Sequence, residues 1–429
     1  MSKEFSPLER AIAHQLESHP RLKLKIKLMY QKISYFLNKK DYQYKSQYSI
    51  SRIGDKNKET FFGYYDKSPE NKTGEYIIYQ ETDYSTKKLP NPSKPIDVIL
   101  ENMETKEIMF RYSTTTYNWQ QGTKLQWLDD YLFIFNHLQN NGKFGSVIVD
   151  AKCGSIVKEL SYPIYDVVGD IGLTLNYDRL AKYRPDYGYR NHIQNLKIPN
   201  YEDDGVFRIN IKDNSCDLII SLQRLIVNFP DERFLNFKGT THKVNHIMIS
   251  PNGKYFVFMH RFFIEGGRKI DRLFVSDIEG KNIKILTDQE MVSHYCWLDN
   301  ENVFGYLRRY DTGDKYYKIN ITTGNVEVIG DGVIDSFGDG HPSFANGNIV
   351  FDTYPDKARL KSIFIYNLKQ KKLDLLGVFF ESLDYYGETR CDLHPKWNFS
   401  EDKIYIDSVH EGLRGLYCLD LKKKMKIDW

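Results

Sequence analysis

Short hydrophobic runs alternate with turn signals from about residue 60 onward. In the clearest copy, the run at 246–249 leads through Ser-Pro-Asn-Gly-Lys at 250–254 into a second run at 255–258. Two further runs follow at 273–277 and 283–286. Aromatic and β-branched runs bounded by Pro, Asn and Gly are typical of strands. Four strands within about 45 residues have the size of one β-propeller blade.

The same pattern recurs through the C-terminal half of the chain. Four units each carry a histidine three residues before a bulky residue that closes the first strand: His246, His294, His341 and His394. Their spacings of 48, 47 and 53 residues match the length of a blade. With looser copies upstream, the repeats are 60–115, 116–163, 164–230, 240–288, 289–332, 333–379 and 380–429. The pattern predicts an all-β, seven-bladed propeller over 60–429, and six blades with an inserted region remain the alternative.

One segment, near 176–200, departs from this pattern. It is rich in Tyr and Arg and lacks the alternation of a strand. We expect an irregular excursion on one face of the propeller. Long loops on rigid scaffolds often hold functional residues.

A basic helical arm is predicted for residues 1–45. Ser6 and Pro7 form a helix start signal, and 21–40 carry seven Lys or Arg and no acidic residue. The stripe of a helix is formed by Leu22, Ile26, Met29, Ile33 and Phe36, although 22–28 also alternates like a strand. Such a helix either lies on an anionic membrane surface or packs on the body with its lysines in water.

Composition narrows the range of functions. The 429 residues include 60 basic and 57 acidic ones, a net charge of +3, which argues against a nucleic-acid partner. Residues 1–40 alone carry +6, so the remainder carries −3. The five cysteines are widely spaced, without CxxC, which favours free thiols. Neither a run of 18 apolar residues nor a signal peptide is found, so we expect a cytoplasmic protein. If the basic helix lies on a membrane, residues 21–40 would make a peripheral contact with its inner face.

The repeat-position histidines are candidates for a metal site. The first strand of each propeller blade lines the central channel, so residues at one repeat position form a ring. His246, His294, His341 and His394 are therefore expected to converge, and imidazole suits divalent transition metals. The alternative is that each histidine caps a strand start and bonds to neighbouring backbone.

A second set of residues suggests an acidic ligand. His260 and Arg261 end one strand, His410 and Arg414 lie in a later unit, and Tyr65 falls near the first one. Arginine clamps carboxylates, while imidazole and phenol groups transfer protons. The chain contains no P-loop, GxGxxG after a strand, HExxH or GxSxG, which argues against kinases, dehydrogenases, zincin proteases and α/β-hydrolases.

Several runs over about 240–429 resemble the oligogalacturonate lyases, within the wider group of TolB-like propellers. They are Ser-Pro-Asn-Gly-Lys at 250–254, Gly-Asp-Gly-His-Pro-Ser-Phe at 338–344, Asp-Thr-Tyr-Pro-Asp at 352–356, Asp-Leu-His-Pro-Lys-Trp at 392–397 and, most clearly, 407–417. Gly-Tyr-Tyr-Asp-Lys at 63–67 also looks like the opening of propeller lyases that act on uronate-containing polysaccharides.

The resemblance implies β-elimination at a 4-linked uronate, assisted by a divalent metal, most readily manganese. The metal would be held by His246, His341 and His394, with His294 as a further candidate. His260 or His410 would be the base, Arg261 and Arg414 would bind the carboxylate, and Tyr65 would be the acid. The family's Gln-x-x-His-x-His ligand run has no counterpart, and the nearest segment is 390–394.

Two functions therefore stay open at the level of sequence. The first is a metal-assisted lyase that acts on an acidic oligosaccharide or polysaccharide, and the four histidines favour it. The second is a noncatalytic glycan- or protein-binding propeller docked at a membrane in capsule or polysaccharide assembly, and the basic arm favours it. The sugar, the metal and the oligomeric state are left open.

Overall fold

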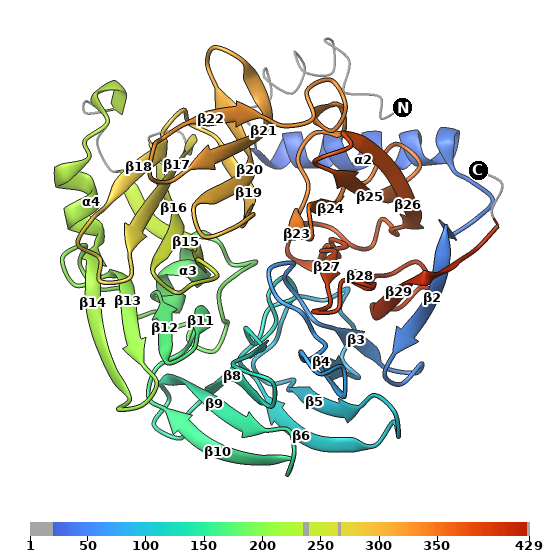
Figure 1. The fold of residues 1–429 in the computed structure, drawn as a ribbon, viewed down its shortest axis with the longest axis horizontal. Coiled ribbons are helices and arrows are strands. Elements are labelled where there is room, and N and C mark those ends of the chain that lie inside the picture. Colours follow the sequence, from blue (N-terminus) through green and yellow to red (C-terminus); the bar gives the residue numbers. More distant parts are fainter. Residues whose placement is uncertain (1–19, 235–239, 265–266, 427–429) are drawn as a thin grey trace.

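The computed structural model describes residues 20–234, 240–264 and 267–426. Within these residues the strands form seven antiparallel sheets arranged as a ring around one axis (Figure 1). The prediction of a seven-bladed β-propeller is confirmed, and the six-bladed alternative is wrong. Only the later part of the predicted arm is described, and its proposed start at Ser6 lies outside these residues.

The strands follow one another from the axis outward in each sheet. The first sheet contains β3 (Glu59–Phe61), β4 (Tyr76–Thr82), β5 (Ile96–Asn102) and β6 (Ile108–Thr114). The second contains β7 (Gln126–Trp127), β8 (Leu132–Leu138), β9 (Phe144–Asp150) and β10 (Ser155–Leu160). The third contains β11 (Asp166–Val168), β12 (Ile171–Thr174), β13 (Gly205–Asn210) and β14 (Ser215–Ser221). The fourth contains β15 (Thr241–Ile249), β16 (Tyr255–Phe263), β17 (Lys269–Asp277) and β18 (Lys284–Thr287). The fifth contains β19 (Val292–Trp297), β20 (Asn302–Arg309), β21 (Gly313–Asn320) and β22 (Val326–Val328).

The last two sheets take their outermost strands from the beginning of the chain. The sixth contains β23 (Ser343–Ala345), β24 (Asn348–Asp352), β25 (Leu360–Asn367) and β26 (Lys372–Phe380), and the seventh contains β27 (Lys396–Trp397), β28 (Lys403–Ser408) and β29 (Gly415–Lys424). The strand β1 (Tyr44–Ser46) pairs with β26, and β2 (Tyr48–Ile53) pairs with β29. The segment before residue 60 therefore closes the ring and covers two sheet edges that would otherwise be open to pairing.

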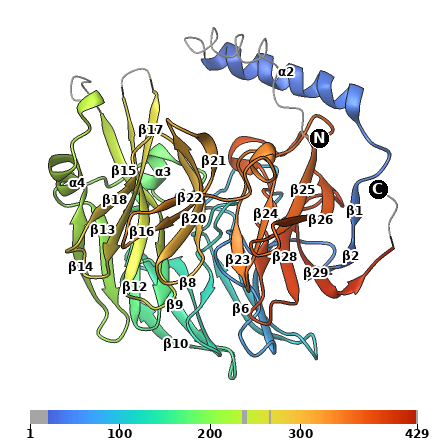
Figure 2. The same cartoon turned by 45° about the horizontal axis from the view of Figure 1, so that its top comes forward.

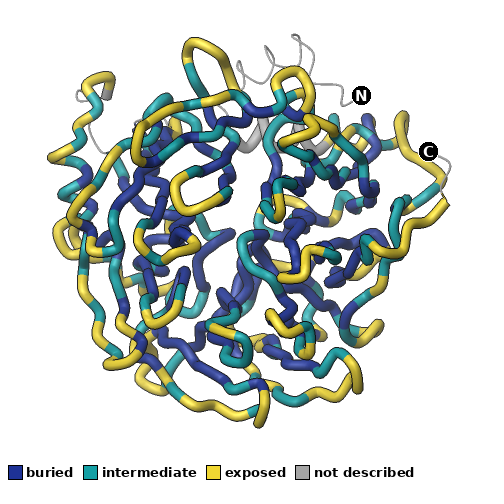
Figure 3. The backbone as a smooth tube through the Cα atoms, viewed as in Figure 1, coloured by how far each residue is buried: buried dark blue, intermediate teal, exposed yellow. Residues whose placement is uncertain are grey.

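Apolar side chains fill the spaces between neighbouring sheets. Between the first and second sheets, for example, Ile78 and Leu100 pack in one cluster with Phe133 and Val147, and all four are fully buried. The strands near the axis are largely buried, whereas the connecting loops are exposed (Figure 3). These packed layers make the ring a rigid support for the side chains at its axis.

Three α-helices accompany the sheets among the described residues: α2 (Pro20–Asn38), α3 (Tyr177–Tyr183) and α4 (Leu222–Asn228). The helix α2 lies outside the ring, beside β25 and β26 (Figures 1 and 2). The ring of Tyr35 lies 5.6 Å from that of Phe380 on β26. No helix in the described part of the chain is long and apolar enough to cross a membrane.

The excursion near 176–200 joins β12 to β13. It begins with α3, whose N-cap residue Asn176 accepts a hydrogen bond from the main-chain N–H of Arg179 at 2.7 Å. Tyr187 and Tyr189 further along are fully buried. The excursion is therefore packed into the propeller and brings its own side chains to the axis.

Candidate functional site

The structure brings the four repeat-position histidines together at the propeller axis. The ring centroids of His294 and His341 lie 4.0 Å apart, and those of His341 and His394 lie 4.3 Å apart. The ring of His246 is 6.0 Å from that of His294. Side chains from four successive sheets therefore form one continuous cluster.

Irregular backbone aims two of these histidines at the axis. On β15, Asn245 is opposite Met259 and Met248 is opposite Val257, so two residues, His246 among them, stand opposite one on β16. Such a bulge redirects a side chain. His246 has φ of 50° and His394 has φ of 46°, a left-handed conformation that is uncommon for residues other than glycine. Strained backbone of this kind concentrates at functional sites.

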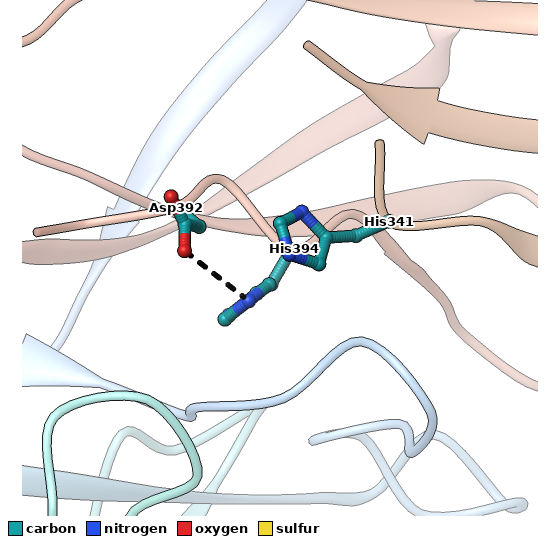
Figure 4. Close-up of side chains that lie close together, drawn as sticks. All are labelled: His341, Asp392 and His394. Carbon is teal, nitrogen blue, oxygen red and sulfur yellow. Dashed lines mark ion pairs between the residues drawn. The ribbon is translucent and has the colours of Figure 1, made fainter. Parts of the chain in front are cut away.

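His341, Asp392 and His394 form the centre of the cluster (Figure 4). Each offers one ligand atom, and these atoms all lie within 4.8 Å of one another. His394 Nδ1 donates to the carbonyl oxygen of Gly63 at 2.9 Å, and His341 Nδ1 donates to the carboxylate of Asp352 at 2.8 Å. In the neutral form of each ring, the proton on Nδ1 leaves the lone pair on Nε2.

Those two Nε2 atoms are buried, and neither has a hydrogen-bond partner among the described residues. A buried polar atom left without a partner is costly, so its presence calls for an explanation. Two imidazole lone pairs beside a carboxylate are a suitable donor set for a divalent cation. The side chains present therefore fit a metal.

The other two histidines are also held at Nδ1. His294 Nδ1 lies 3.2 Å from Asp339 Oδ1, and His246 Nδ1 lies 2.8 Å from the hydroxyl of Tyr64. Burial lowers the pKa of His246, His294 and His394, which keeps them neutral at pH 7. Burial also acts on His341, but the attraction of Asp352 outweighs it and the pKa lies above its ordinary value.

A cavity of about 260 Å³ lies against this cluster. Its walls are formed by Arg184, Tyr187, His246, Met259, Arg261, Lys269, Ser293, His294, Asp339, Tyr354 and Arg390. The excursion contributes Arg184 and Tyr187, so this segment forms part of the site.

The cavity is lined by four cationic side chains and the carboxylate of Asp339. Arg184 is paired with Asp186 at 2.9 Å, and Arg390 donates to Asp392 at 2.7 Å. Arg261 contacts Asp271 through Nε, while its Nη1 is buried without a partner in the described structure. An arginine with a free, desolvated N–H group favours an anionic ligand such as a carboxylate.

Of the five residues predicted for catalysis, Arg261 lines the cavity, whereas Tyr65 lies beside the histidine cluster and is not part of the cavity wall. The ring of Tyr65 is 5.5 Å from that of His341. Its hydroxyl, however, donates to the carbonyl of Tyr295 at 2.9 Å and accepts from the main-chain N–H of that residue at 3.1 Å. Burial raises its pKa well above the ordinary value. Tyr65 is thus placed to support the histidines rather than to reach a ligand.

The other three residues do not join the cavity. His260 points away from it, with Nε2 3.1 Å from His242 Nδ1 and Nδ1 accepting from Arg272 at 2.9 Å. His410 packs on the rings of Tyr44 and Tyr417, at 4.6 and 4.4 Å.

Arg414 donates to the carbonyl oxygens of Trp119, at 3.1 Å, and Thr389, at 3.0 Å. It therefore ties together the segments that join β6 to β7 and β26 to β27, and it does not line the cavity.

Most of the acidic and cationic partners at the site were not predicted from the sequence. A signal for two of them was present: Asp339 and Asp392 each precede a repeat-position histidine by two residues. In the structure each lies beside the histidine of the preceding sheet, Asp339 beside His294 and Asp392 beside His341. No comparable pattern marks Arg184 or Arg390.

Comparisons with known proteins give the fold. No protein-family model matches the chain, and no curated protein matches its sequence. An oligogalacturonate lyase from Vibrio parahaemolyticus is structurally similar, with 14% identity and a TM-score of 0.55 over 89% of this chain and 98% of that one. An oligogalacturonate lyase in complex with manganese has 12% identity and a TM-score of 0.56 over 89% of this chain and 95% of that one. At these identities the likeness shows a shared seven-bladed fold.

Proposed function

We propose that this protein is a metal-assisted lyase that cleaves an acidic, uronate-containing glycan by β-elimination. One observation carries the proposal: two buried imidazole lone pairs and a carboxylate lie together beside His294, which lines a cavity walled by cations. The likeness to oligogalacturonate lyases, one of them in complex with manganese, supports it at the level of the fold.

The metal would be held by His341, His394 and Asp392, with His294 beside them. Imidazole and carboxylate ligands accept manganese as well as zinc and iron, and manganese is the metal we propose. When bound, the cation would neutralise the uronate carboxylate and acidify the neighbouring C5 proton.

The side chains of the cavity would bind and orient the sugar. Arg261 offers its unpartnered Nη1 to the carboxylate, and the nearby Arg390 adds positive charge. A preorganised set of cations stabilises negative charge as it develops on the carboxylate, which lowers the barrier to proton removal.

Proton transfer would use a neutral imidazole and a protonated phenol at the cavity wall. His246 is neutral because burial lowers its pKa, so it can accept the C5 proton, and Tyr64 orients its ring. The electron pair forms the C4=C5 double bond as the C4–O4 bond breaks. Burial raises the pKa of Tyr187, so this residue stays protonated and can supply the proton to the leaving oxygen.

The test combines metal content with product formation. Protein without a histidine tag would be stripped with chelator, reloaded with Mn²⁺ and analysed by mass spectrometry, as wild type, His341→Ala and His260→Ala. We expect about one equivalent in wild type and in the His260→Ala control, and none in His341→Ala. Loaded with metal, wild type and His260→Ala should convert oligogalacturonate to an unsaturated product that absorbs in the ultraviolet, and His341→Ala should not.

Two results would contradict this function. If wild type takes up no metal after reloading, the metal-assisted mechanism is wrong. If metal binds but no uronate oligosaccharide yields an unsaturated product, the proposed lyase activity is wrong.

A further inference from the structure

The helix α2 presents large apolar side chains to solvent. Met29, Ile33, Phe36 and Leu37 are 60%, 53%, 69% and 80% exposed. Their spacing of four, seven and eight residues from Met29 places them on one face of the helix. Grouped exposed apolar residues of this size mark an interaction surface. We call these four residues the α2 stripe.

The opposite side of the helix holds it on the propeller. Ser34 is buried, and Tyr35 packs its ring against Phe380 of the sixth sheet at 5.6 Å. The α2 stripe therefore points away from the body instead of into a core. Figure 2 shows α2 standing clear of the sheets along most of its length.

Positive charge accompanies the stripe. Residues 21–40 contain seven Lys or Arg and no acidic residue. Among those whose exposure is described, Lys32, Lys39 and Lys40 are exposed. Lys32 precedes Ile33 and Phe36 by one and four residues and so flanks the stripe, and Lys39 directly follows the last helical residue, Asn38. Packing this stripe on that of a second copy would bring two such cationic segments together, whereas an anionic surface would attract them.

We propose that α2 docks the propeller on an anionic lipid surface. The helix would lie in the plane of the interface, with the α2 stripe at the acyl boundary and the lysines among the headgroups. An apolar face flanked by lysines binds such surfaces through burial of apolar area together with electrostatic attraction. This inference is independent of the chemistry at the axis.

The test is sedimentation of the full chain with lipid vesicles. Vesicles of 70% phosphatidylcholine and 30% phosphatidylglycerol would be compared with pure phosphatidylcholine. We expect binding to the anionic vesicles that weakens with salt, and little binding to the neutral ones. Phe36→Ser with Leu37→Ser should weaken binding about a hundredfold. Lys32→Gln with Lys39→Gln should weaken it about thirtyfold, since each lysine contributes about fivefold.

Matched controls separate the stripe from general surface properties. Val227→Ser with Phe399→Ser removes side chains that are 60% and 52% exposed elsewhere, and binding should stay unchanged. Lys281→Gln with Lys369→Gln is the control for charge.

Three outcomes would overturn the proposal: no binding of wild type to anionic vesicles, binding unaffected by the stripe substitutions, or equal losses in the controls. Light scattering tests whether a second copy of the chain, instead of a lipid surface, packs on the α2 stripe. A dimer that becomes monomeric on Phe36→Ser with Leu37→Ser, without vesicle binding, would assign the stripe to a second copy.

Discussion

The carboxylate of Asp352 accepts two hydrogen bonds from His341, one from its main-chain N–H at 2.7 Å and one from Nδ1 at 2.8 Å. Its second oxygen accepts the main-chain N–H of His394 at 3.0 Å. One buried aspartate at the end of β24 therefore fixes the position of two histidines and the tautomer of one. A carboxylate that orients a histidine in this way is typical of metal sites.

Asp352→Asn should weaken metal binding without removing a proposed ligand. An amide does not enforce the tautomer that leaves the lone pair on His341 Nε2, so we expect a 10- to 100-fold loss in Mn²⁺ affinity. Titration calorimetry on chelator-treated protein measures it. Asp299→Asn, at a surface turn, is the control. Unchanged affinity in Asp352→Asn, with an unchanged fold, would show that this hydrogen bond does not tune the site.

Arg261→Gln should weaken binding of an acidic oligosaccharide. Arg261 carries a buried Nη1 without a partner in the described chain, and a hydrogen bond to a charged group is worth about 1.5–3 kcal/mol. We therefore expect a 10- to 100-fold loss in affinity for oligogalacturonate, measured by calorimetry.

Arg272→Gln provides the matched control for this substitution. Arg272 is buried in the neighbouring strand but bonds to His260 and to the carbonyl of Phe229 instead of facing the cavity. If both variants lose affinity equally, the effect comes from general damage to the fourth sheet.

The features that could be predicted from the sequence are those that repeat along the chain. The seven units and the convergence of four histidines follow from one pattern repeated at blade length, because equivalent positions in a ring share one axis. The sequence could not show in the same way which of His260 and Arg261 faces the cavity. Successive side chains of a strand face opposite sides, and β16 is buried on both, so its apolar pattern does not show which side meets the cavity.

Contacts between segments that are distant in the chain could not be predicted from the sequence either. Arg184 reaches the axis because the excursion folds inward, and β2 closes the ring by pairing with β29 across almost the whole chain. His410 was a candidate for catalysis because of its neighbours in sequence, yet in space it packs among rings from three strands. None of these contacts leaves a local periodic signal.

His410→Phe should reduce the loss of stability in acid. Burial lowers the pKa of His410 to about 4, from an ordinary value of about 6.5. Between these values the unfolded chain binds a proton that the folded chain does not, so stability falls as pH drops from 6.5 to 4, by about 3 kcal/mol. Phenylalanine suits the surrounding rings and does not titrate.

The measurement is urea unfolding of wild type and His410→Phe at pH 7.5 and at pH 4.5. Both proteins hold an uncharged side chain at pH 7.5, so the difference between them there removes the effect of altered packing. We expect the variant to lose about 2–3 kcal/mol less than wild type on acidification. Equal losses would mean that His410 is protonated in the folded protein.

Removing the strands that close the ring should destabilise the propeller far more than removing the arm. A chain that starts at residue 44 keeps β1 and β2, whereas one that starts at 54 exposes the edges of β26 and β29. Ile53 is buried and packs between the last and first sheets, and Arg52 Nη2 donates to the carbonyl of Lys58 at 2.7 Å. We expect the shorter chain to unfold at lower temperature and to associate through its open edges.

Calorimetry and size-exclusion chromatography of both truncated chains check this expectation. The chain starting at residue 44 should elute as a folded propeller and lose little stability, because it keeps β1 and β2 and loses only α2 and its contacts, such as that of Tyr35 with Phe380. If the chain starting at 54 unfolds at the wild-type temperature and elutes unchanged, the ring holds together without β2, and the packing between the first and seventh sheets must be sufficient to close it.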